Sequence, residues 1–243
     1  MTFKNIIKKI FHKLGIKIQK INPATSSQAQ LMASLRKFNI DLVFDVGANF
    51  GQFAIEIREG GFKGKIISFE PLTSAYDKLK KVNMLSGDAE WEIFPRCALG
   101  NLEGEITINI AGNSASSSIL NMLDSHINIA PHTKNIGKET TPIYRLDSVA
   151  KEYLLESTRP FLKIDTQGFE WQVLDGALNS IPQIQGVLLE LSLIPLYQDQ
   201  KLWGDLIKRM SDYGFTLWSI QPMFTDMHDG RTYQIDGIFY RDL

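Results

Sequence analysis

The sequence predicts a doubly wound α/β domain on a mostly parallel sheet, with one antiparallel strand near the C-terminus. From residue 41 onward, short apolar runs alternate with segments of helical spacing. This alternation is typical of βαβ units, in which helices cover both faces of a parallel sheet. The last two apolar runs, 215–220 and 234–240, leave no room for a crossover helix between them. We therefore expect a hairpin there, one strand of which runs against the rest of the sheet.

Residues 1–40 precede this domain as a basic segment and a linker. Apolar residues recur at helical spacing on one side of the first part: Phe3, Ile6, Ile7, Ile10, Phe11 and Leu14. The first twenty residues also carry six lysines, with no acid before Asp41: Lys4, Lys8, Lys9, Lys13, Lys17 and Lys20. Two interpretations remain open: a helix lying on an anionic membrane surface, or a helix packed on its own domain or on a second subunit. A linker around Pro23 leads into a short helix expected at 27–38.

The elements of the second region, 41–243, follow one another in order. Strands are expected at 41–46, 65–69, 91–98, 105–110, 161–165, 186–191, 215–220 and 234–240. Helices are expected up to residue 59 and at 73–85, 146–156, 169–179 and 200–213. A polar stretch at 111–139, with a cluster of serines, interrupts this alternation.

Composition and charge exclude several classes of protein. The single cysteine, Cys97, rules out an internal disulfide framework and a cysteine-based zinc cluster. The net charge is −1, and removal of the six N-terminal lysines leaves about −7, which argues against nucleic acid as a partner. No apolar run approaches the roughly 18 residues of a membrane span, and the N-terminus lacks the pattern of a secretory signal. We expect a cytoplasmic protein, located at the inner face of the membrane if the basic segment binds lipid.

The loop after the first strand points to the class of cofactor. Gly47, Asn49 and Gly51 stand at offsets 0, 2 and 4, whereas a dinucleotide fingerprint has glycines at offsets 0, 2 and 5. Asp45 also places a carboxylate where a pyrophosphate would be repelled. A ligand with a cationic or neutral centre suits this loop better than a dinucleotide.

Glu70 ends the second strand, in front of Pro71. A carboxylate at this point can accept hydrogen bonds from both hydroxyls of a ribose, as it does in nicotinamide enzymes. The alternative is an acid that caps the following helix. Together, Asp45 and Glu70 describe an adenosyl ligand without phosphates, and S-adenosylmethionine is the common molecule of that kind.

Several motifs resemble the FkbM-type methyltransferase family, in order across about residues 41–240. They are Phe44–Gly51, Phe69-Glu70-Pro71, Ala98-Leu99-Gly100, Leu162–Glu170 and Asp236–Phe239. The resemblance implies a class I methyltransferase (Rossmann-like) fold, S-adenosylmethionine as cofactor, and O-methylation in natural-product or bacterial polysaccharide pathways. It implies that the first loop, with Asp45, Gly47, Ala48, Asn49 and Gly51, cradles the methionine and ribose. Glu70, followed by Pro71, then binds the ribose, and Cys97 and Ala98 border the adenine.

Asp165, at the end of the fourth parallel strand, is the main catalytic candidate. It could act as a base, orient the acceptor or bind a metal, or it could only cap the next helix or pair with Lys163. A lysine inside a central strand needs an acidic partner, for which Glu190 in the next strand is the candidate. Lys163, Asp165 and Glu190 could then form a catalytic network or a purely structural one. Asp165 and Glu190 could together hold Mg²⁺, but Leu191 and Ser192 follow where a further oxygen ligand would be needed, which disfavours a metal.

His228 is a second candidate base, because its loop, 221–233, is placed to overhang the strand ends. The segments 111–139 and 192–200 would form the acceptor side, and their serine, asparagine and histidine content suits a hydroxylated acceptor. The sequence therefore predicts an S-adenosylmethionine-dependent O-methyltransferase that acts on a sugar, a glycan or a natural-product small molecule. The alternatives are a nicotinamide-dependent oxidoreductase and a non-catalytic membrane-surface adaptor.

Overall fold

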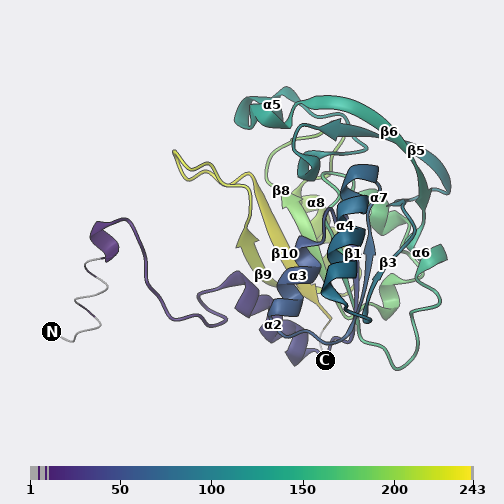
Figure 1. Cartoon of the computed structure of the whole chain (residues 1–243), viewed down its shortest axis with the longest axis horizontal. Coiled ribbons are helices and arrows are strands. Elements are labelled where there is room, and N and C mark those ends of the chain that lie inside the picture. The colour runs from purple at the N-terminus through teal and green to yellow at the C-terminus, as the bar shows by residue number, and fades with distance from the viewer. Residues whose placement is uncertain (1–4, 6–8, 10, 242–243) are drawn as a thin grey trace.

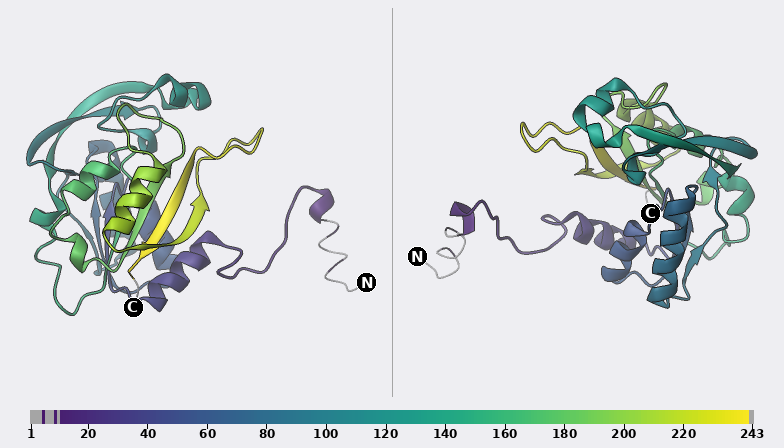
Figure 2. Two further views of the ribbon diagram at one scale, coloured as in Figure 1. Left: turned by 180° about the vertical axis from the view of Figure 1, so that it is seen from behind. Right: turned by 45° about the horizontal axis from the view of Figure 1, so that its top comes forward.

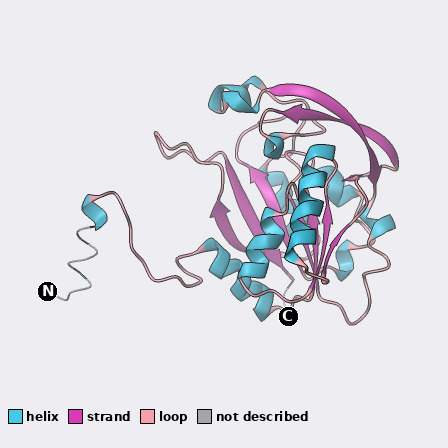
Figure 3. Cartoon of the chain, viewed as in Figure 1, coloured by secondary structure: helices cyan, strands magenta, loops and turns pink. Residues whose placement is uncertain are grey.

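The computed structural model describes residues 5, 9 and 11–241, and its centre is a seven-stranded sheet (Figures 1 and 3). From one edge to the other, the strands are β3 (Trp91–Ile93), β2 (Lys65–Phe69), β1 (Leu42–Val46), β7 (Pro160–Ile164), β8 (Gly186–Ser192), β10 (Gln234–Tyr240) and β9 (Thr216–Pro222). β10 runs antiparallel to both of its neighbours, and the pairs among β3, β2, β1, β7 and β8 are parallel. The predicted sheet, with one antiparallel strand in the C-terminal hairpin, is confirmed.

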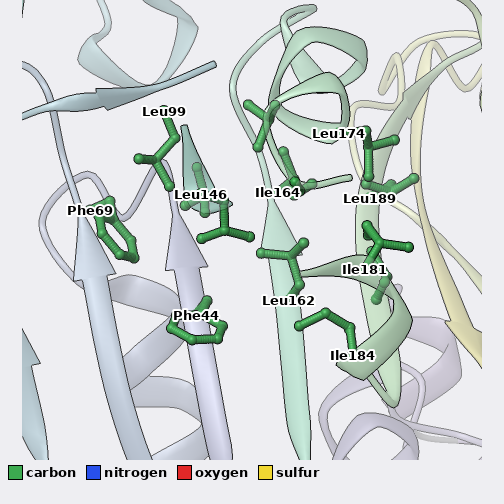
Figure 4. Close-up of a cluster of buried hydrophobic side chains, with 14 of the residues drawn as sticks. Phe44, Phe69, Leu99, Leu146, Leu162, Ile164, Leu174, Ile181, Ile184 and Leu189 are labelled. Carbon is green, nitrogen blue, oxygen red and sulfur yellow. The ribbon is translucent and has the colours of Figure 1, made fainter. Parts of the chain in front are cut away.

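Helices cover both faces of this sheet, because alternate residues of each strand point to opposite sides. On one face, α2 (Ser27–Lys37), α3 (Gln52–Glu59) and α4 (Thr73–Ser86) pack on Val43, Ile66 and Leu188. On the other face, α6 (Leu146–Val149), α7 (Glu170–Asp175) and α8 (Trp203–Asp212) pack on a larger cluster. Figure 4 shows part of that cluster, in which Phe44, Leu162 and Leu189 come from three neighbouring strands.

The strand expected at 91–98 is confirmed only over its first three residues, because the chain leaves the main sheet after Ile93. Pro95 cannot donate a ladder hydrogen bond, and the chain turns there. It continues into a second sheet with the strand order β4 (Ala98–Leu99), β6 (Asn135–Tyr144) and β5 (Gly104–Ala111). In Figure 1, β5 and β6 arch over the carboxyl ends of the central strands.

The polar stretch 111–139 is more ordered than its sequence indicates. It holds the short helices η1 (Ser114–Ser116), α5 (Asp124–Ile129) and η2 (Pro131–Thr133), followed by the first half of β6. β6 was missed because residues 135–138 are exposed and show no apolar alternation. Two expected helices are also shorter than predicted, since α6 ends at Val149 and α7 ends at Asp175.

The N-terminal region divides into an exposed segment and a packed helix. The amphipathic helix expected over residues 3–14 lies mostly outside the described residues. Residues 11–21 are exposed, and in Figures 1 and 2 they lie apart from the domain. The helix expected at 27–38 is confirmed as α2, whose capping residue Ser26 accepts a hydrogen bond from the Ala29 amide. Phe38, which follows this helix, stacks on Tyr240 of β10, with 3.9 Å between the ring centroids. Within the described residues, the structure has no helix that is long and apolar enough to cross a membrane.

Candidate active site

A cavity of about 290 Å³ opens at the carboxyl ends of the central strands. The chain runs from β1 towards β2 on one side and returns at β7 on the other, so the strand connections diverge between β1 and β7. Ligands of doubly wound sheets bind at such a point. The lining comes from residues within 46–56, 69–72, 97–99, 114–119 and 163–167, together with Ile108, Leu188, Met223 and Asp236.

The loop between β1 and α3 forms one wall of the cavity. Gly47 has a φ of 76°, and a β-carbon at this position would lie 1.9 Å from the carbonyl oxygen of Asp165. Only glycine lets the loop approach the end of β7 so closely. Ala48 and Asn49 also line the cavity, whereas Gly51 lies behind it, where it precedes α3 and contacts Trp91.

Glu70 lines the cavity beside this loop and is almost fully buried. Its two carboxylate oxygens accept hydrogen bonds from the backbone amides of Asn49, at 2.7 Å, and Leu72, at 2.8 Å. Burial raises the pKa of Glu70 to about 7, against the lowering effect of these hydrogen bonds. With one protein donor on each oxygen, both oxygens keep acceptor capacity for a ligand. Pro71, Cys97 and Ala98 also line the cavity, and burial raises the pKa of the Cys97 thiol to about 12.

Asp45 lies beneath the cavity and not in its lining. Its side chain is fully buried, 3.1 Å from the Lys163 ammonium through Oδ1, while Oδ2 accepts a hydrogen bond from Ser68. Lys163 Nζ also donates to the carbonyl oxygen of Gly47, at 2.9 Å. Burial lowers the pKa of a lysine, but the carboxylates of Asp45 and Asp165 outweigh this effect, so the pKa of Lys163 is raised.

The expected pairing of Lys163 with Glu190 is therefore wrong, for a reason of register. Lys163 faces Asp45 directly across the β1–β7 pair and Leu188 across the β7–β8 pair. Glu190 stands two residues further along β8, beyond the end of β7.

Asp165 lies at the mouth of the cavity, where Oδ2 is 3.7 Å from Lys163 Nζ and Oδ1 accepts a hydrogen bond from Gln167. Gln167 also donates to both oxygens of Glu190, which burial and the charge of Asp165 hold at a pKa well above its ordinary value. Asp236 lines the cavity from β10, and burial and Asp165 raise its pKa to about 7. The structure thus brings Lys163, Asp165 and Glu190 close together, although Glu190 is not among the lining residues.

Sequence reasoning did not single out Gln167 or Asp236 as site residues, although both lie in the family motifs. Tyr197, which donates to Gln167 at 3.0 Å, stands in a loop without any recognisable pattern. His228 lies in the exposed hairpin between β9 and β10, outside the cavity lining, and Met223 lines the cavity in its place. Within the described part of the chain, the structure has no group of three or more histidine, cysteine or acidic side chains that could hold a metal ion.

The fold and the position of the cavity define the architecture of a class I methyltransferase. Residues 45–217 match the FkbM methyltransferase domain, and the chain belongs to that family.

Two relatives illustrate the similarity. The methyltransferase sdnD of Sordaria araneosa is 26% identical in an alignment of 154 positions, and the match covers 55% of this chain and 59% of that protein. The crystal structure of methyltransferase FkbM from Methylobacillus flagellatus superposes with a TM-score of 0.56 at 13% identity, over 96% of this chain and 50% of that one. The chain thus spans between half and three-fifths of the length of these relatives, and the structural likeness supports the fold alone.

The buried ion pair gives a stability prediction. Lys163→Met leaves the Asp45 carboxylate buried and unpaired, so we expect the free energy of unfolding to fall by about 3 to 5 kcal/mol. The double variant Asp45→Asn/Lys163→Met removes both charges and should lose less than the sum of the two single variants in urea denaturation. Lys208→Met, which breaks an exposed ion pair with Asp212, is the control and should cost less than about 1 kcal/mol. Additive losses would contradict the coupling.

Proposed function

We propose that this protein is an S-adenosylmethionine-dependent O-methyltransferase whose acceptor is a hydroxyl group of a sugar, a glycan or a natural-product small molecule. The observation that carries the proposal is the environment of Glu70. This buried carboxylate faces the cavity and can still accept hydrogen bonds from a ligand. Among the described lining residues, the only cationic side chain is that of Lys163, and it is already bound to Asp45 and to Gly47. Such a cavity suits a ribose and a positively charged group, and it offers a pyrophosphate no free cation.

The lining residues fit the parts of this cofactor. Glu70 would accept hydrogen bonds from the ribose hydroxyls. A largely apolar end of the cavity would hold the adenine; its residues are Leu72, Cys97, Ala98, Leu99, Ile108 and Ile119. The backbone of Gly47 and Asn49 would border the methionine part. The acidic groups Asp165 and Asp236 suit the positive charge of a sulfonium.

Asp165 would carry the chemical role at this site. When bound, S-adenosylmethionine supplies a methyl group that is already activated for in-line displacement. The chain must then hold the acceptor hydroxyl in line and accept its proton, and positioning supplies much of the lowering of the barrier. Asp165 is the lining carboxylate nearest to Lys163, and its partly exposed side chain can reach a bound acceptor.

The acceptor would bind between the strand ends and the segment around η1. Ser114, Ser117 and Ser118 line the cavity from that segment and offer hydroxyl groups to a sugar-like molecule. Family membership supports methyl transfer over the two alternatives, a nicotinamide-dependent oxidoreductase and a non-catalytic membrane-surface adaptor. The shortage of free cations in the cavity also disfavours the first, and the formed cavity disfavours the second.

The basic segment favours contact of this enzyme with an anionic membrane surface. Phe11, Leu14, Ile16, Ile18 and Ile21 are exposed, and all hydrogen bonds of residues 11–25 given by the structure lie within that segment or its immediate neighbours. Exposed apolar side chains interleaved with lysines suit the interfacial region of a bilayer.

The first test of this proposal is the pH dependence of cofactor affinity. A ribose that donates to Glu70 favours the ionised carboxylate, so binding lowers its pKa from about 7 and releases a proton. The affinity measured by calorimetry should therefore rise with pH through about 7 and level off above it. Glu70→Gln should weaken binding by about tenfold or more and flatten this rise, because a hydrogen bond to a charged group is lost. The exposed Glu105→Gln is the control, and unchanged affinity in Glu70→Gln would refute the role.

The second test separates binding from chemistry at Asp165. Asp165→Asn preserves the shape and removes the charge, so cofactor affinity should change little while kcat falls by about a hundredfold or more. Transfer of labelled methyl groups into extracted glycans and metabolites, followed by mass analysis of the product, supplies the assay. The exposed Asp77→Asn serves as the matched control. Turnover of Asp165→Asn within threefold of the wild type would shift the base role to another residue, with His228 tested next.

The third test concerns the membrane. Charge reversal at Lys13, Lys17 and Lys20 should lower the affinity for phosphatidylserine-containing vesicles by about a hundredfold at low salt, since each surface lysine contributes about 1 kcal/mol. The control reverses three lysines in or next to helix α4, Lys78, Lys80 and Lys81, and so makes the same change in net charge. Cofactor affinity should be the same in both variants. Equal vesicle binding by the two variants would contradict a specific role of the basic segment.

A further inference from the structure

Gln167 holds an unusual position in the backbone next to the cavity. It has a φ of 56°, in the left-handed region that residues with a β-carbon rarely occupy, and Gly168 follows with a φ of 96°. The Ser118 hydroxyl donates to the main-chain oxygen of Gln167 at 2.7 Å. A strained conformation of this kind persists where the surrounding structure fixes it.

The side chain of Gln167 is bound at both ends. Its amide nitrogen donates to Asp165 Oδ1 at 2.9 Å and to the two oxygens of Glu190 at 2.9 and 2.8 Å. Its amide oxygen accepts from the hydroxyl of Tyr197 at 3.0 Å. Burial raises the pKa of Tyr197, and its hydroxyl group therefore remains a hydrogen-bond donor. Because this donor faces the amide oxygen of Gln167, the amide nitrogen is the end that faces the two carboxyl groups.

The charges around Asp165 explain why a neutral donor stands there. The ionisable groups near it come from every neighbouring element: Asp45 on β1, Lys163 on β7, Glu170 on α7, Glu190 on β8, Tyr197 in the following loop and Asp236 on β10. Lys163 is the cation among them, and it lies closer to Asp45 than to Asp165. The amide of Gln167 stands between the acidic side chains of Asp165 and Glu190 and donates hydrogen bonds to both of them.

Gln167 also joins Asp165 to the wall of the cavity formed by the segment around η1, between β5 and β6. Tyr197 also lies 2.9 Å from the carbonyl oxygen of Ser116, and Ser118 is the donor to the Gln167 main chain. Both serines belong to the segment that lines the cavity around η1.

We infer that Gln167 is the positioning residue of this site: its amide fixes the orientation and charge of Asp165 and couples that carboxylate to the acceptor-side segment 116–118. The inference rests on the proposed function, in which Asp165 receives the proton of the acceptor. Gln167 acts through Asp165 and Tyr197, and it does not itself take part in methyl or proton transfer.

The test follows the carboxyl group of Asp165 directly and needs no acceptor. Carbon-13 NMR of protein labelled at aspartate gives the midpoint of its titration, and Asp165→Asn identifies the signal. In Gln167→Met the midpoint should rise by about one pH unit, because a hydrogen bond to the charged form is lost. Tyr197→Phe and Ser118→Ala should raise it by a smaller amount, because they loosen the amide without removing it.

Gln185→Met is the matched control, since Gln185 also donates a side-chain hydrogen bond, to the main chain of Arg241, at the opposite end of the sheet. It should leave the Asp165 midpoint unchanged, whatever its effect on the melting temperature. A midpoint in Gln167→Met within about 0.2 of the wild type, or an equal rise in Gln185→Met, would overturn the inference. If Gln167→Met does not fold, Tyr197→Phe decides in the same way, because it removes a single hydroxyl. Calorimetry with S-adenosylmethionine on the wild type keeps the two questions apart: absence of binding refutes the proposed function, whereas an unmoved midpoint refutes the role of Gln167.

Discussion

The Lys163 ammonium organises the centre of this molecule. It lies fully inside the sheet, between a carboxylate on the neighbouring strand and the carbonyl oxygen of Gly47 in the first loop. Removing such a charge from water is costly unless the partner geometry is good, which requires β1 and β7 to keep their register. Since the same ammonium binds the loop after β1, the position of that loop depends on the ion pair. The position of the cavity wall therefore depends on an ion pair whose acid, Asp45, lies beneath the lining.

Several carboxyl groups surround this one cation. The excess of acidic over basic side chains determines which ligands the cavity favours. Burial raises the pKa of Glu70 and of Asp236 to about 7, and it raises the pKa of Glu190 well above its ordinary value. Near neutral pH, Glu70 and Asp236 are therefore only partly ionised. A positively charged ligand would favour their ionised forms, whereas a phosphate would meet additional repulsion. The preference for a cationic cofactor over a dinucleotide follows from this charge distribution as well as from the loop spacing.

The sequence could predict the parts of the site that lie on the central strands. Buried parallel strands have a strong apolar signal, and their carboxyl ends meet at one edge, so Gly47, Glu70 and Asp165 could be placed together from the sequence alone. It could not predict which acid meets Lys163, because that depends on a register across strands that are distant in sequence. β6 and Tyr197 were missed for another reason: exposed strands and irregular loops have no periodic pattern, and only their tertiary contacts define them.

These tertiary contacts also separate the two halves of the cavity. The half around Glu70 is built from the sheet and the first loop, whereas the other wall is lined by residues 114–119 of the insertion between β5 and β6. The loop after β8 supports this insertion without lining the cavity. The amide of Leu123 donates to Leu196, and that of Gln198 donates to Asn121, so the insertion between β5 and β6 and the loop after β8 form one unit. Because its surface side chains do not hold the sheet together, substitutions there would leave the fold intact. Acceptor specificity would therefore reside in this wall, and Gln167, which binds both the wall and Asp165, lies where the wall meets the half built from the sheet.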